Sequence, residues 1–101
     1  MLRIEYLILF KIKAWLNLTE GRRQGEAVSE RTINKHKNDI FRLLVNVQPG
    51  MFVTIEMKIY ADVMMFIDLL TEADVDLGNL GIREIPFVRF IEQIRRMYHF
   101  D

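Results

Sequence analysis

Cysteine is absent from the 101 residues, so the sequence excludes disulfide bonds and cysteine-based metal sites and is compatible with a reducing, cytoplasmic setting. The two histidines, His36 and His99, are too few to form a zinc site without cysteine. No glycine-rich stretch precedes a Lys-Ser or Lys-Thr pair, which excludes a Walker-type phosphate loop. A serine nucleophile elbow is also missing.

A net charge is also lacking, because 14 Lys and Arg balance 14 Asp and Glu. This balance argues against a generic nucleic-acid-binding module. The charges are nevertheless uneven along the chain: residues 1–48 hold nine basic and five acidic side chains, and residues 49–101 hold five and nine. The two halves could orient an anionic ligand, pack against each other, or differ by chance on solvated helices.

Long uninterrupted hydrophobic runs are absent as well. The apolar stretch around residues 7–16 is broken by Lys11 and Lys13, whereas a membrane span needs about 20 mostly apolar residues. A secretory signal with a cleavage site is not present either. We therefore expect no membrane segment and read this stretch as a core helix of a soluble protein. Since half of the residues are hydrophobic, residues 1–101 are expected to form one small domain.

Apolar residues at helical spacing predict four helices, at about residues 4–19, 30–47, 55–72 and 85–98. Ser29 and Thr54 are the expected N-caps of the second and third helices, and Pro86 suits the first turn of the fourth. Residues 51–55 could form a short extended segment, and residues 73–82 are expected to form an irregular connection. The predicted fold class is all-α, an antiparallel bundle of about four helices.

The second helix carries a dense polar cluster: Lys35, His36, Lys37, Asn38 and Asp39. The first helix is apolar almost all round and still contains Lys11 and Lys13. Cations on a largely buried helix need an anionic or hydrogen-bonding partner. We therefore predict that Lys11 or Lys13 approaches Asp39.

Other interpretations of these residues remain open. Lys11 could extend its stem along the core and keep its ammonium in water. Lys35 and Asp39, four residues apart, could form an ordinary surface pair worth about 0.3–0.5 kcal/mol. His36 is a weak candidate general base or simply a helix residue. Asp74 and Asp76 could hold magnesium or form a solvated acidic turn.

The segment from residue 5 to residue 44 resembles the C-terminal helical region of AbiEii/AbiGii-type nucleotidyltransferases. These are bacterial proteins, and many are toxins of abortive-infection toxin–antitoxin pairs. Lys11 and Ala14 match the Lys-x-x-Ala of one family motif, and residues 35–43 match a second motif in which basic residues precede an Asp. Residues 73–82 also resemble the tail of that branch.

The resemblance implies that Mg²⁺ and a nucleoside triphosphate bind an N-terminal α/β domain, whose Gly-Ser motif and metal-binding aspartates are not in this sequence. The chain would then be a fragment, a truncated gene product or one piece of a split protein, inactive and without a cofactor alone. It would contribute candidate substrate-binding side chains to the nucleotide site: Lys11, Lys13, Lys35, His36, Asn38 and Asp39. Its partners would be an antitoxin or a separate catalytic domain.

Two other functional classes are compatible with the sequence. The first is a stand-alone interaction module that forms a homodimer through an exposed apolar face. The second is a helix-turn-helix protein that binds nucleic acid through the second helix, with Arg22-Arg23 or Arg95-Arg96 as further contacts. The neutral charge and the long turn before the second helix count against nucleic-acid binding.

Overall fold

The computed structural model describes residues 3–48, 50–70, 75, 77–82 and 84–100. The described residues are mostly helical and include four helices and two short strands. The helices are α1 (Ile4–Arg23), α2 (Glu30–Val45), α3 (Met57–Leu69) and α4 (Phe87–Met97). The strands are β1 (Val53–Ile55) and β2 (Tyr98–Phe100).

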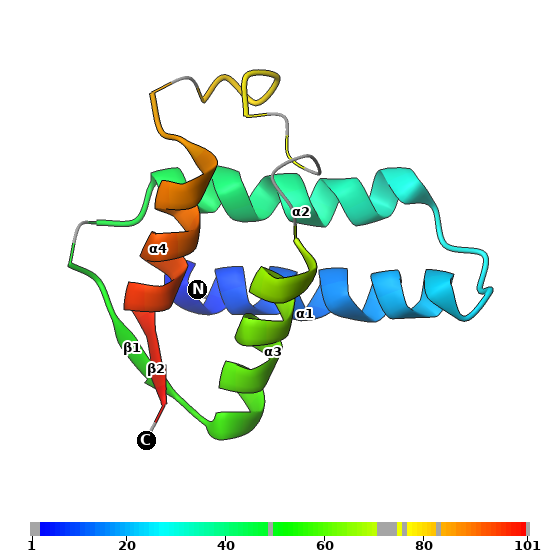
Figure 1. Ribbon diagram of the computed structural model, residues 1–101, viewed down its shortest axis with the longest axis horizontal. Helices are drawn as coiled ribbons and strands as arrows, with labels where there is room; N and C mark the ends of the chain where they lie inside the picture. Colours follow the sequence, from blue (N-terminus) through cyan, green and yellow to red (C-terminus); the bar gives the residue numbers. More distant parts are fainter. Residues whose placement is uncertain (1–2, 49, 71–74, 76, 83, 101) are drawn as a thin grey trace.

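The four helices do not form one bundle. α1 and α2 lie side by side and run antiparallel, as predicted for neighbouring helices, whereas α3 and α4 run across their direction (Figure 1). The prediction of an antiparallel four-helix bundle is therefore wrong in its arrangement. A helical period shows which face of a helix is apolar, but it does not set the angle at which that face meets its neighbour.

The prediction of an all-α fold is also incomplete, because β1 and β2 form a two-stranded parallel sheet. Val53 pairs with Tyr98 and Thr54 with His99. Thr54 therefore lies in a strand, although it was expected to cap a helix, and Tyr98 begins β2 where the fourth helix was expected to end. Parallel pairing requires a long crossover connection, so neither three-residue segment could reveal its partner locally.

The start of α2 agrees with the prediction, and the end of α1 does not. The Ser29 hydroxyl oxygen accepts a hydrogen bond from the Arg31 backbone N–H at 3.2 Å, which confirms the N-cap. α1 continues through Gly21, one turn beyond the expected end. The chain instead turns after Gly25, whose φ of +93° is a conformation that favours glycine.

Aromatic side chains join α1 to α3 and α2 to α4 in the core. Trp15 of α1 is buried and meets Phe66 of α3 edge to face, with ring centroids 5.2 Å apart. Phe41 of α2 meets Phe90 of α4 in the same way at 5.3 Å. The buried Tyr98 hydroxyl donates a 2.6 Å hydrogen bond to the Glu5 carbonyl oxygen, which fastens β2 to the first turn of α1.

Candidate functional site

The predicted contact between the first two helices is present. The Lys11 ammonium donates a hydrogen bond to Asp39 Oδ2 at 3.1 Å, and the two side chains are 20% and 24% exposed. The other carboxylate oxygen, Oδ1, lies 3.6 Å from Arg42 Nη1. Asp39 therefore pairs with one cation from α1 and with one from its own helix, and the three groups together keep a net positive charge. We refer to Lys11, His36 and Asp39 as the polar seam.

Lys13 lies away from the polar seam. Its ammonium pairs with Asp62 of α3 at a distance of 3.2 Å, and its side chain is 57% exposed. Residues two apart on a helix point in nearly opposite directions, because each residue advances the helix by about 100°. The two lysines of α1 consequently attach it to two different helices, Lys11 to α2 and Lys13 to α3.

His36 belongs to the polar seam and is held neutral there. Its pKa lies below the ordinary 6.5 because burial disfavours the imidazolium, and the nearby Lys11 and Lys35 charges act in the same direction. Asp39 acts in the opposite direction and does not compensate. Nδ1 of His36 is buried and has no hydrogen-bond partner among the described residues.

The lowered pKa of His36 predicts a pH-dependent stability. Below pH 6.5 the unfolded chain binds a proton at this position that the folded chain resists. The contribution of neutral His36 is therefore complete above that pH and is lost as the pH falls toward the lower folded-state pKa. Urea denaturation of the wild-type protein and His36→Gln at pH 7 and pH 5 should show a smaller acid loss in the variant. Equal losses in the two proteins would contradict the neutral state of His36.

The five polar residues predicted to form one cluster lie on different sides of α2. Lys37 is buried, with 8% of the residue exposed, and its ammonium donates to Asn34 Oδ1 at 3.1 Å. The burial of Lys37 could be predicted from the sequence, because Lys37 lies four residues after Ile33 and three before Ile40, on the apolar face of the helix. Lys37 is therefore a core residue and is not part of a solvent-facing cluster.

Lys35 and Asn38 lie on the outer face of α2, away from the core. They line a shallow depression together with Glu30, Arg31, Asn34 and Arg42. Three of these six side chains are cations and one is a carboxylate, so the depression is basic. We call Arg31, Lys35, Asn38 and Arg42 the α2 stripe. Arg31 and Arg42 were missed as candidate residues, although they lie four and seven residues from Lys35 and so share its face.

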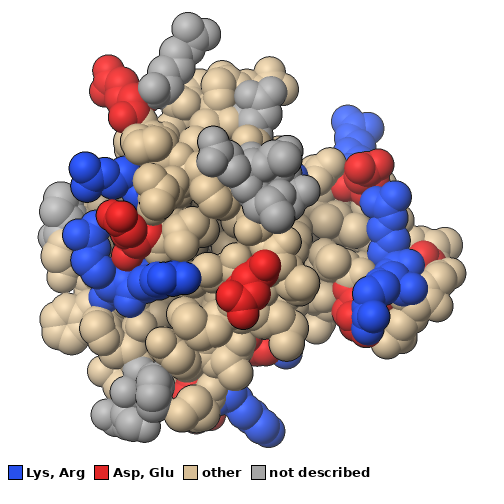
Figure 2. All heavy atoms as spheres, in the orientation of Figure 1, with Lys and Arg blue, Asp and Glu red and all other residues tan. Residues whose placement is uncertain are grey.

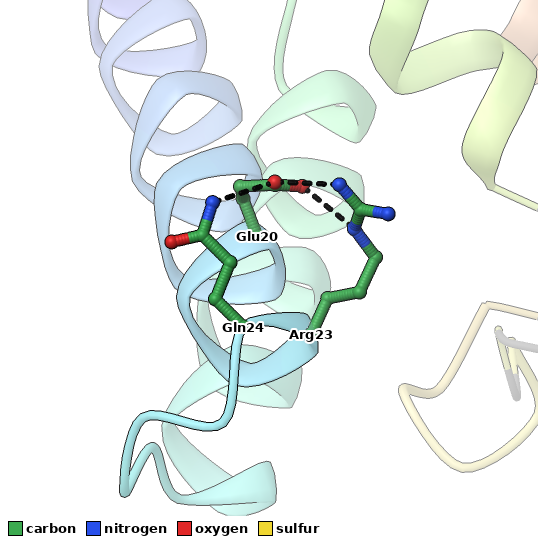
Figure 3. Close-up of polar contacts among 3 residues, drawn as sticks. All are labelled: Glu20, Arg23 and Gln24. Carbon is green, nitrogen blue, oxygen red and sulfur yellow. Dashed lines mark hydrogen bonds and ion pairs between the residues drawn. The ribbon is translucent and has the colours of Figure 1, made fainter.

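Some basic side chains outside the α2 stripe are paired with acidic ones. Basic and acidic side chains lie close together at the end of the molecule formed by the α1–α2 connection (Figure 2). There Arg23 donates to both carboxylate oxygens of Glu20, at 2.7 and 3.0 Å, and Gln24 donates to one of them at 3.0 Å (Figure 3). The pKa of Glu20 is lowered chiefly by the Arg23 hydrogen bonds. Arg23 is thus neutralised, in contrast to Lys35.

Among the described residues, no group of three or more His, Asp and Glu side chains is arranged to hold a metal ion. Asp74 and Asp76, which were considered for magnesium, lie outside the described residues. None of the helices in the described ranges combines the length and the apolar character that a membrane crossing requires.

The chain matches no family model, and searches of curated proteins and of solved structures find no match for it.

Proposed function

We propose that this chain is the helical, phosphate-binding part of a nucleotidyltransferase-like protein of the AbiEii/AbiGii type. The observation that carries the proposal is the α2 stripe, where three cations and an amide lie on one exposed helix face. The resemblance of residues 5–44 supports it independently. By this resemblance, the Mg²⁺ ions and the catalytic carboxylates belong to a separate domain, and this chain does not catalyse alone.

The side chains of the α2 stripe suit a triphosphate. Arg31, Lys35 and Arg42 are separated by one and two turns of helix, so their rows of donors extend along roughly 16 Å of the helix axis. Guanidinium groups bind phosphate oxygens through two parallel hydrogen bonds, and the lysine adds a mobile positive charge. Asn38 can donate from its amide between them. One polyphosphate chain can thus contact several members of the stripe.

The polar seam has a supporting role in this proposal. The Lys11–Asp39 contact holds α2 against α1, and the Arg42–Asp39 pair orients the end of the stripe. Lys11 and His36 would border the bound phosphates, whereas Lys13 is committed to α3.

Calorimetric titration with tripolyphosphate and with GTP, at low salt, tests the proposal. We expect the double variant Arg31→Gln/Lys35→Gln to bind at least about tenfold more weakly, since charge-assisted hydrogen bonds each contribute about 1.5–3 kcal/mol. Lys58→Gln is the matched control, because Lys58 is an exposed lysine on α3, outside the stripe. Equal affinities for the double variant and the control would refute the proposal.

The alternative function, a stand-alone association module, rests on a different face. Phe10 of α1 and Ile59 of α3 are 62% and 38% exposed and line a small apolar depression beside the Lys13–Asp62 pair. Light scattering on the samples used for the titrations separates the two proposals. A dimer mass together with a flat phosphate titration would favour association, and a monomer that binds tripolyphosphate would favour the phosphate-binding function.

A further inference from the structure

A cavity separate from the polar seam and the α2 stripe lies between the end of α2, the segment that leads into β1, and α4. Its volume is about 460 Å³, within the 300–1,000 Å³ typical of small-molecule sites. Apolar side chains line much of it, and two of these, Val45 and Phe52, are 46% and 65% exposed. An apolar ligand in the cavity would shield these two side chains from water.

Two basic side chains border this apolar lining on one side. Arg89 and Arg96 line the cavity from one face of α4, two helical turns apart. Figure 2 shows basic side chains over α4, with an acidic side chain among them. Neither arginine forms an ion pair with a described residue. No Asp or Glu among the described residues lines the cavity. The two guanidinium groups are therefore free to bind an anion.

His99 supplies a further polar group at the same cavity. Its Nε2 lies 2.7 Å from the carbonyl oxygen of Arg96, so Nε2 is the protonated donor. The ring is also held edge to face by Phe52, with centroids 5.6 Å apart. These contacts fix the imidazole in place, and in the neutral ring Nδ1 is an acceptor. In the sheet, Thr54 pairs with His99, and this pairing brings Phe52, two residues before Thr54, close to the His99 ring.

We propose that the cavity binds a small amphipathic carboxylate, with its apolar body against Val45 and Phe52 and its carboxylate between Arg89 and Arg96. An inorganic anion would leave Val45 and Phe52 exposed to water, and an uncharged hydrocarbon would leave the arginines without a partner. A ligand with both an apolar body and a carboxylate contacts the apolar lining and the two arginines at the same time. This inference does not depend on the proposed phosphate-binding function, because none of its residues belongs to the α2 stripe.

Titrations of the whole chain, monitored by calorimetry or by NMR, test the apolar body and the carboxylate of the ligand separately. Octanoate should bind at least tenfold more tightly than butyrate, because each buried methylene contributes to binding. It should also bind at least tenfold more tightly than octanol, which lacks the charge. These comparisons use the wild-type protein and need no variant to fold.

Variants then assign the binding to this cavity. Arg89→Gln/Arg96→Gln should weaken octanoate binding at least tenfold. Arg95→Gln, an exposed arginine of the same helix that does not line the cavity, should change it less than twofold. The double variant should keep its affinity for tripolyphosphate, which distinguishes this site from the α2 stripe. Octanol binding as tightly as octanoate, inorganic phosphate displacing octanoate, or equal effects of Arg95→Gln and the double variant would overturn the proposal.

Discussion

Replacing Phe90 by alanine should destabilise the protein by about 3–5 kcal/mol, the usual loss for a fully buried phenylalanine. Phe90 is completely buried, and its ring meets Phe41 of α2 edge to face at 5.3 Å. The substitution removes the main aromatic contact between α4 and α2 and leaves a cavity that the surrounding side chains fill only in part. Urea denaturation followed by circular dichroism measures the change in the free energy of unfolding.

Val88→Ala is the matched control for this prediction. Val88 lies on the same helix, two residues away, and is 56% exposed. Its truncation should change the free energy of unfolding by no more than about 0.5 kcal/mol. Similar denaturation midpoints for Phe90→Ala and Val88→Ala would show that α4 does not pack on α2 through Phe90. The cavity beside α4 should also lose its octanoate affinity in Phe90→Ala, because this packing positions Arg89 and Arg96.

Asp39→Ala is expected to destabilise the protein by about 1–2 kcal/mol. This range exceeds the 0.2–1 kcal/mol typical of exposed pairs, since Asp39 and Lys11 are only 24% and 20% exposed. It is well below the cost of breaking a fully buried pair. The variant leaves the Lys11 ammonium without its carboxylate and removes the partner of Arg42. Thermal unfolding should show a midpoint lower by several degrees, at about 4–8 °C per kcal/mol for a domain of this size.

Glu30→Ala serves as the comparison for Asp39→Ala. Glu30 is also acidic and on α2, but its side chain is 72% exposed and its Arg22 partner is 3.9 Å away. We expect a smaller loss, chiefly from the removal of a negative charge at the helix N-terminus. Equal thermal midpoints for the two variants would contradict the structural role of the Lys11–Asp39 contact.

Much of the helical structure and one key contact could be predicted from the residues alone. The apolar period of α2 and the Ser29 cap are local signals, and both agree with the structure. The Lys11–Asp39 contact followed from the cost of burying an unpaired cation next to a helix with an acidic group. The same reasoning did not show which of Lys11 and Lys13 pairs with Asp39, because it used the charges of the two side chains and not their positions around α1.

Predictions of the fold failed where the deciding interaction is distant in the sequence. β1 and β2 are three residues long, and their pairing joins segments on either side of α3 and α4. The periodicity of α4 indicates an apolar face, and only its packing shows that this face lies across α2 and leaves Arg89 and Arg96 beside a cavity.

The sequence by itself determined which segments become helices, where α2 begins and that Asp39 pairs with a lysine of α1, because propensity, capping and the cost of an unpaired charge act over short distances or on identifiable groups. Only the tertiary structure decided the direction of α3 and α4 across α1 and α2, the parallel strand pair and the cavity beside α4. These features depend on how side chains from separate elements fill a shared space, and no single segment contains that information.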